Sequence, residues 1–108
     1  MFTRVKIDTA KKLMKYYKQW GQPNYDVFYR LEDGEWEECS TTECYLEKGD
    51  IMAPSKADLL DWLIMLVDHG VLKKHIVRCL YTESFGLSAE SFVNDLNLFY
   101  FLDDEQSN

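Results

Sequence analysis

The spacing of apolar and polar residues predicts three amphipathic helices, near residues 8–20, 56–68 and 88–102. In each helix apolar side chains recur every three or four positions, as they do on a buried helical face. Ser55 and Ser88 are suitable N-caps for the second and third helices. Gly21 and Gly70 end the first and second helices, because glycine adopts a left-handed conformation without steric cost. The apolar arc of the second helix is wide enough to pack on two sides, which makes it the predicted centre of the fold.

Between the first two helices the pattern changes to the alternation that is typical of strands. A hairpin is predicted at about residues 25–39, with its turn at Glu32-Asp33-Gly34. The polar stretch at 39–50 is expected to be a loop that can carry a short strand around residues 44–46.

Residues 71–82 fit two structures. Their β-branched and aromatic side chains favour a strand near 74–82, but several apolar positions also have helical spacing. We predict the strand and leave the helix as an alternative. The sequence therefore predicts an α+β fold, with a short antiparallel sheet covered by three helices in a single compact domain, residues 1–108.

Composition supports a globular domain outside membranes. The chain has 108 residues, of which 46% are hydrophobic, enough for one core without stabilising metals or disulfides. No apolar run approaches the roughly 20 residues that a membrane span requires. Residues 1–13 are polar and basic where a signal peptide would be apolar, and three cysteines lack a disulfide-framework spacing. The expected location is the cytoplasm of a host cell, without membrane association.

Charge is distributed unevenly along the chain. Residues 1–20 contain six basic side chains and one acidic side chain, whereas the rest contains six basic and 18 acidic ones. Such an acidic body attracts basic partners rather than nucleic acid. A lysine face on the first helix leaves a rival hypothesis of nucleic-acid binding, although its ordinary role is a solvated surface; it contains Lys11, Lys12, Lys15 and Lys18.

Chemistry-bearing residues do not form a recognisable catalytic set. There is no glycine-rich phosphate loop, nucleophile elbow or H-E-x-x-H motif, so we expect no enzyme activity and no cofactor. The chain contains residues of the types that bind zinc, but they lack the close spacing of a metal site, so no metal site is expected. These residues are Cys39, Cys44, His69, His75 and Cys79. A redox pair of Cys39 and Cys44 is a weaker interpretation than two loop or strand cysteines and a core thiol at Cys79.

Acidic residues concentrate between positions 32 and 50. If Glu35 and Glu37 share a strand face, their carboxylates recur about every 7 Å, on the order of two phosphate steps of 3.4 Å along DNA. That spacing would suit nucleic-acid mimicry, and the alternative is charge that keeps an edge hairpin unpaired. A second acidic ridge with an apolar anchor is predicted on the central helix. Together the candidate partner-binding residues are Glu32, Asp33, Glu35, Glu37, Glu38, Asp58, Asp61, Met65 and Asp68.

A further pattern covers roughly residues 5–82. It comprises the helix Val5–Trp20, then Tyr25, Phe28 and Tyr29, then Ala53-Pro54-Ser55 leading to Leu59, Trp62 and Leu63. This pattern resembles a group of small uncharacterised proteins encoded by phages and prophages of gut anaerobes. In that group the helix after Ala-Pro becomes charged beyond Trp-Leu, whereas residues 64–67 here stay apolar. The resemblance implies a phage-type protein without an established activity, and the departure implies additional packing by the helix from Ser88.

These observations lead to a functional hypothesis. We predict a non-enzymatic, acidic binding protein of phage or prophage type that inhibits a host nucleic-acid-binding defence protein by occupying its basic cleft. Two alternatives remain: a nucleic-acid-binding accessory protein that uses the lysine face, or a homodimeric structural protein. The dimer would use the apolar end of the C-terminal helix, at Leu98, Phe101 and Leu102.

Overall fold

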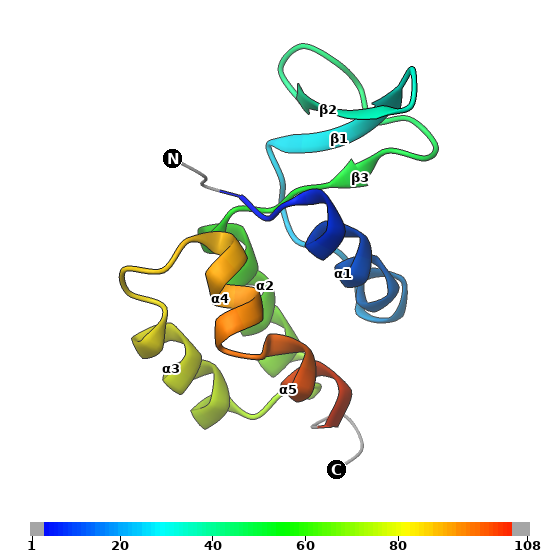
Figure 1. Cartoon of the computed structure of the whole chain (residues 1–108). Helices are drawn as coiled ribbons and strands as arrows, with labels where there is room; N and C mark the ends of the chain where they lie inside the picture. Colours follow the sequence, from blue (N-terminus) through cyan, green and yellow to red (C-terminus); the bar gives the residue numbers. More distant parts are fainter. Residues whose placement is uncertain (1–3, 105–108) are drawn as a thin grey trace.

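The computed structural model of the protein describes residues 4–104 and has an α+β fold (Figure 1). In chain order its elements are α1 (Ile7–Trp20), β1 (Val27–Glu32), β2 (Glu35–Ser40), β3 (Ile51–Met52), α2 (Lys56–Asp68), α3 (Lys74–Glu83), α4 (Ala89–Asp95) and α5 (Leu98–Asp104). The sheet lies at one end of the molecule and α3 and α5 at the other, with α1, α2 and α4 between them (Figure 1). Within the described residues no helix combines the length and apolar character needed to cross a membrane.

The sheet is antiparallel, with β1 in the centre and the order β2-β1-β3. The predicted hairpin is confirmed. Asp33 and Gly34 form its turn with φ angles of 50° and 82°, and this pair of positive angles matches the twist of the two strands. The loop expected at 39–50 is present from residue 41, but the short strand that it could carry around 44–46 does not form. The third strand forms at Ile51–Met52 instead. Those two side chains are buried against the core, which gives this short segment the stronger reason to pair.

Two different structures cover the faces of the sheet. One face carries Tyr29, whose hydroxyl donates a 2.6 Å hydrogen bond to the Val5 carbonyl, and Trp36, which lies under the Lys11 ammonium of α1. The opposite face carries the fully buried Phe28 and Arg30, and Arg30 is bonded to the loop at 41–50. The sheet is therefore packed by α1 on one side and crossed by its own loop on the other.

The predicted central helix, α2, is confirmed in position and capping. Ser55 accepts a hydrogen bond from the Asp58 backbone N–H, and the Asp58 carboxylate accepts one from the Ser55 N–H. The buried face of α2 includes Trp62, whose indole N–H donates a 2.9 Å hydrogen bond to the Gly21 carbonyl at the end of α1. This bond and the apolar contacts around it join α1 to α2.

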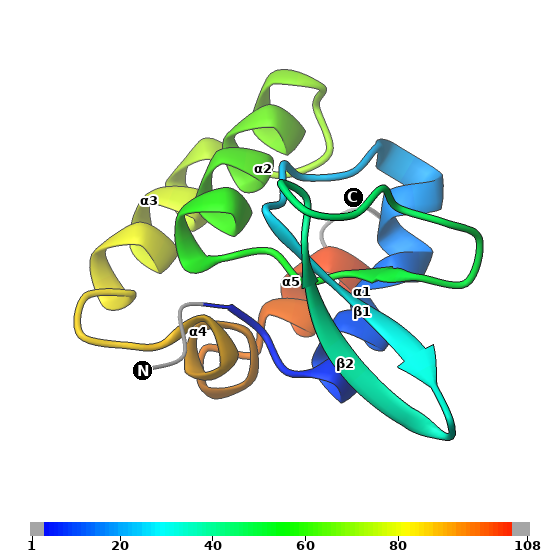
Figure 2. The same ribbon diagram turned by 90° about the horizontal axis from the view of Figure 1, so that it is seen from above.

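The segment predicted as a strand at 74–82 is the helix α3, and this prediction is corrected. After Gly70 the chain reverses, and the Leu72 N–H bonds to the Leu66 carbonyl, so that α3 returns beside α2 (Figure 2). Val77 and Leu80, three positions apart, are both buried in this arrangement. Helical spacing therefore won over β-propensity because burial against α2 requires these two side chains on one face.

The third predicted helix, 88–102, is interrupted. Ser88 is its N-cap as expected, accepting from the Ser91 N–H at 3.1 Å, but α4 ends at Asp95. Asn97 then adopts a left-handed conformation with φ 55°, which asparagine tolerates better than most residues, and α5 starts in a new direction. The change of direction buries Leu98 and Leu102 completely.

The Tyr17 hydroxyl is buried without a hydrogen-bond partner among residues 4–104. Its ring packs edge-on against Trp62 at a centroid distance of 5.4 Å, and burial raises the pKa of Tyr17 above its usual value. Because a buried unsatisfied hydroxyl costs about 1–3 kcal/mol, we expect Tyr17→Phe to raise the free energy of unfolding by about 1 kcal/mol. Urea denaturation measures this change.

Tyr16→Phe is the matched control, since the Tyr16 hydroxyl donates a hydrogen bond to Asp103. This variant is expected to lose stability. A Tyr17→Phe protein less stable than the wild type would contradict the burial of an unpaired hydroxyl.

Candidate protein-binding surface

The acidic hairpin has a defined register and points away from α2. Figures 1 and 2 both show its turn projecting from the body on the side away from α2. The two-residue turn fixes the register, in which Glu32 faces Glu35 and Arg30 faces Glu37. The hairpin therefore presents its side chains in a defined order.

Register also decides which acidic residues share a face. Glu35 and Glu37 lie on the same face of β2, as predicted, together with Glu32 of β1. Glu38 lies on the other face, where its carboxylate is 3.5 Å from the Arg4 guanidinium. The four exposed carboxylates at 32–37, which we call the acidic tip, have no ion pair among the described residues; they are Glu32, Asp33, Glu35 and Glu37.

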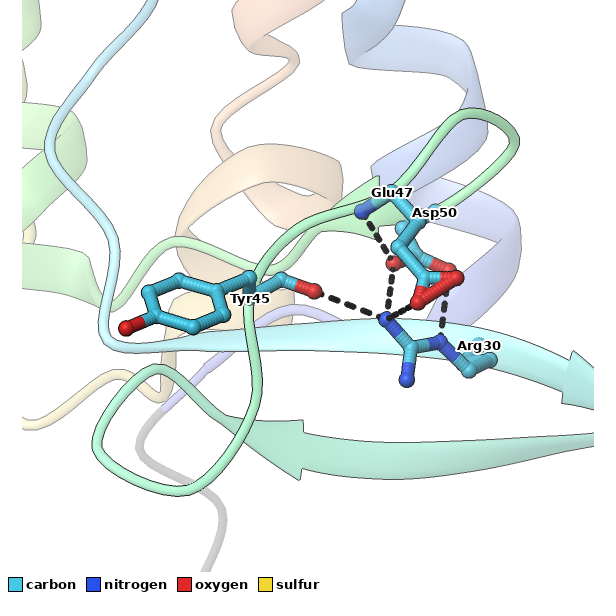
Figure 3. Close-up of polar contacts among 4 residues, drawn as sticks. All are labelled: Arg30, Tyr45, Glu47 and Asp50. Carbon is cyan, nitrogen blue, oxygen red and sulfur yellow. Dashed lines mark hydrogen bonds and ion pairs between the residues drawn. The ribbon is translucent and has the colours of Figure 1, made fainter.

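Arg30 holds two other acidic residues of this segment, Glu47 and Asp50, through its guanidinium group (Figure 3). Arg30 donates from Nε to Asp50 Oδ1 at 3.1 Å, and from Nη2 to Asp50 Oδ2 at 2.7 Å and the Tyr45 carbonyl at 2.8 Å. The Glu47 carboxylate is 3.5 Å from the same nitrogen, and the Glu47 N–H bonds to Asp50. The hydrogen bonds from Arg30 are the main reason that the pKa of Asp50 lies below its ordinary value. This cluster holds the 41–50 loop on the sheet.

Sequence reasoning missed this role of Arg30, although a signal was present. Arg30 is the only basic residue between Lys18 and Lys48. A single cation within such an acidic stretch is expected to attract the nearby carboxylates. The structure thus assigns Glu47 and Asp50 to loop anchoring and leaves the acidic tip as the unpaired part.

The predicted ridge on α2 divides into different roles. Asp58 caps its own helix, while Asp61 and Asp68 are exposed without an ion pair among the described residues. Met65 is half-buried, with its methyl group beside Gly21, so only part of it can serve as the predicted apolar anchor. The ridge and the acidic tip lie on separate parts of the molecule (Figure 1).

The lysine face of α1 is exposed, but two of its members have local contacts. The Lys11 ammonium lies 4.9 Å from the Trp36 ring centroid, and the Lys15 ammonium lies 3.8 Å from an Asp103 oxygen. Lys12 and Lys18 remain exposed with no ion pair in the described part of the chain. Two such lysines offer few phosphate contacts.

The cysteines and histidines do not assemble into a metal site. Among residues 4–104, no group of three or more histidine, cysteine, aspartate or glutamate side chains could hold a metal ion. Cys39 and Cys44 are half-buried free thiols, and burial raises the pKa of Cys39 more than the nearby Arg30 lowers it. Cys79, predicted in the core, is exposed, because α3 buries Val77 and Leu80 on its other side.

The apolar C-terminal end does not form the exposed patch that suggested a dimer. Leu98 and Leu102 are fully buried, and Phe101 is half-buried. Tyr100 is the exposed large apolar side chain of this segment. These residues belong mainly to the core of the monomer.

Comparison with known proteins leaves the chain's own residues as the basis for function. No protein-family model, no curated protein and no solved structure matches this chain.

Proposed function

We propose that this protein is a non-enzymatic, phage-type binding protein that places its acidic tip against the basic surface of a host protein. The observation that carries the proposal is the group of four exposed carboxylates within six residues, without an ion pair among the described residues. Neighbouring Glu38, Glu47 and Asp50 all have an arginine partner. Among residues 4–104 no cation pairs with the acidic tip, so a partner can supply the counter-charge.

The arrangement of the tip favours binding over stability. Glu32 and Glu35 are directly opposite each other on paired strands, and like charges in this position destabilise a hairpin. On the other face of the same hairpin, exposed Leu31 faces half-buried Trp36.

The spacing of the carboxylates indicates the kind of partner. Glu35 and Glu37 occupy alternate positions on one face, and such side chains recur about every 7 Å. That distance is on the order of two phosphate steps of 3.4 Å. We therefore propose a host nucleic-acid-binding protein as the target, inhibited through occupation of its basic cleft.

The test uses two variants with the same change in net charge. Glu35→Lys/Glu37→Lys alters the acidic tip, whereas Asp61→Lys/Asp68→Lys alters the α2 ridge. Tagged wild-type protein is used to capture partners from host lysate at low salt, and the affinity of each variant for the captured protein is then titrated. We expect the tip variant to bind at least about tenfold more weakly, with slower association and a smaller salt dependence, and the ridge variant to bind like the wild type.

The outcomes separate the alternatives. Equal weakening in both variants would indicate general charge attraction and contradict a site at the hairpin. Undiminished binding by the tip variant would leave its charges with the simpler role of protecting an edge strand. Chemical denaturation provides the folding control, because a lysine opposite Glu32 replaces a repulsion and is expected to preserve or slightly raise stability.

A further inference from the structure

An apolar groove runs between α2 and α3, on a surface that the acidic tip does not include. Its volume is about 560 Å³, and its apolar lining consists of Ile64 and Val67 from α2 with Val77 and Tyr81 from α3. The two helices lie side by side in both views (Figures 1 and 2). A strand at 74–82 could not have formed this groove, so sequence reasoning did not find it.

Large apolar side chains remain exposed along this groove. Ile64 is 50% exposed and Tyr81 51%, while Phe85, just beyond α3, is 70% exposed. The rings of Tyr81 and Phe85 pack edge to face with centroids 5.6 Å apart, a contact that favours this arrangement of the two rings. A patch held in this way loses little conformational entropy when a partner covers it.

The charges beside the groove define what the partner must carry. Lys74 and Arg78 lie one helical turn apart on α3 and both line the groove. No ion pair joins either cation to a carboxylate in the described residues, although the chain contains 19 acidic side chains. Asp68 lies on the α2 side of the groove without pairing to them. A partner bound in the groove can supply the carboxylates that would pair with Lys74 and Arg78.

We propose that this groove binds an amphipathic helix of a protein partner, with an apolar stripe on the groove floor and acidic residues facing Lys74 and Arg78. The groove between two neighbouring helices accepts a third helix because its side-chain ridges fit between theirs. Apolar residues at i, i+3 or i+4, and i+7 would contact Ile64 and Tyr81. This surface lies on α2 and α3 and selects an acidic partner, whereas the acidic tip lies on β1 and β2 and selects a basic one.

A fluorescently labelled peptide provides the test. It is a helix-forming peptide of about 14 residues with leucines at i, i+3 and i+7 and glutamates beside them, and its twin has lysine in place of every glutamate. Titration of the full-length protein is followed by fluorescence anisotropy. We expect saturable micromolar binding of the acidic peptide and at least about tenfold weaker binding of its basic twin.

Variants of the protein assign the binding to the groove. The Lys74→Glu/Arg78→Glu variant is expected to bind the acidic peptide at least about tenfold more weakly than the wild type and to bind the basic twin more tightly. Lys11→Glu/Lys12→Glu on α1 has the same charge change and is expected to leave the affinity unaltered. Ile64→Ser, at a half-exposed position, is expected to weaken both peptides, and circular dichroism verifies that each variant folds.

Three results would overturn the proposal. The first is no saturable binding of the acidic peptide below about 1 mM. The second is an equal loss in the α1 control, which would indicate attraction to the protein's lysines in general. The third is a dimer in light scattering that the Lys74→Glu/Arg78→Glu variant abolishes, because a second copy of this chain would then be the occupant.

Discussion

Leu98→Ala is expected to lower the free energy of unfolding by about 2–5 kcal/mol, because it removes a fully buried leucine and leaves a cavity in the core. Leu98 begins α5, directly after the left-handed Asn97 turns the chain inward. Its side chain lies in the same buried cluster as residues of α1 and α2. Denaturation in urea measures the loss, which is a large fraction of the stability of a domain of this size.

Tyr100→Ala is the matched control from the same helix. Tyr100 is exposed, so its truncation is expected to change stability by no more than about 0.5 kcal/mol. The pair also tests the dimer hypothesis for the C-terminal end. A Leu98→Ala protein that kept its unfolding free energy but lost a dimer in light scattering would place Leu98 at an interface rather than in the core.

Asp50→Asn is expected to lower the free energy of unfolding by about 1.5–3 kcal/mol at neutral pH, because hydrogen bonds to a charged group are lost. The Asp50 side chain is only 5% exposed. It accepts hydrogen bonds from Arg30 Nε, from Arg30 Nη2 and from the Glu47 N–H. An asparagine keeps the shape but has neither the charge nor the second acceptor oxygen. Hydrogen exchange at residues 41–50 is expected to accelerate, since Asp50 accepts two of the hydrogen bonds by which Arg30 of β1 holds this loop.

The effect of Asp50 depends on pH in a defined direction. Hydrogen bonds from Arg30 hold the folded-state pKa of Asp50 below its ordinary value. Its stabilisation is therefore fully present above an unfolded pKa of about 3.9 and is lost as the pH falls through the lower folded pKa. The difference in the free energy of unfolding between the wild type and Asp50→Asn should therefore become smaller as the pH falls into the acid range.

Asp61→Asn is the control for this second pair of measurements. Asp61 is exposed and has no ion pair among the described residues, so its stability change is expected to stay within about 0.5 kcal/mol. A gap between wild type and Asp50→Asn that stayed constant from pH 7 into acid would contradict the charge-dependent role of Asp50.

The acidic surface shows how far sequence reasoning reached. Alternation along a strand placed Glu35 and Glu37 on one face, because that relation depends on only three consecutive residues. The pairing of Glu38 with Arg4 depends on segments that are far apart in the chain. Which carboxylates stay unpaired was therefore not readable from their spacing.

The helices show the same division. The caps at Ser55 and Ser88 were predictable, since each depends on a hydrogen bond to a residue three positions ahead. The interruption between α4 and α5 could not be predicted from a glycine or proline, because the sequence has neither at this point. It follows from the burial of Leu98 and Leu102, which a continuous helix from Ser88 would have directed elsewhere.

By itself the sequence determined the positions of α1, α2 and the hairpin, the caps of α2 and α4, and the acidity of the hairpin tip. All of these depend on interactions within a few residues or on composition. The tertiary structure alone decided that 74–83 is a helix, that Arg30 anchors the 41–50 loop and that α2 and α3 enclose a groove. These features depend on which apolar and charged groups meet across the fold, and that is settled only when distant segments compete for the same core.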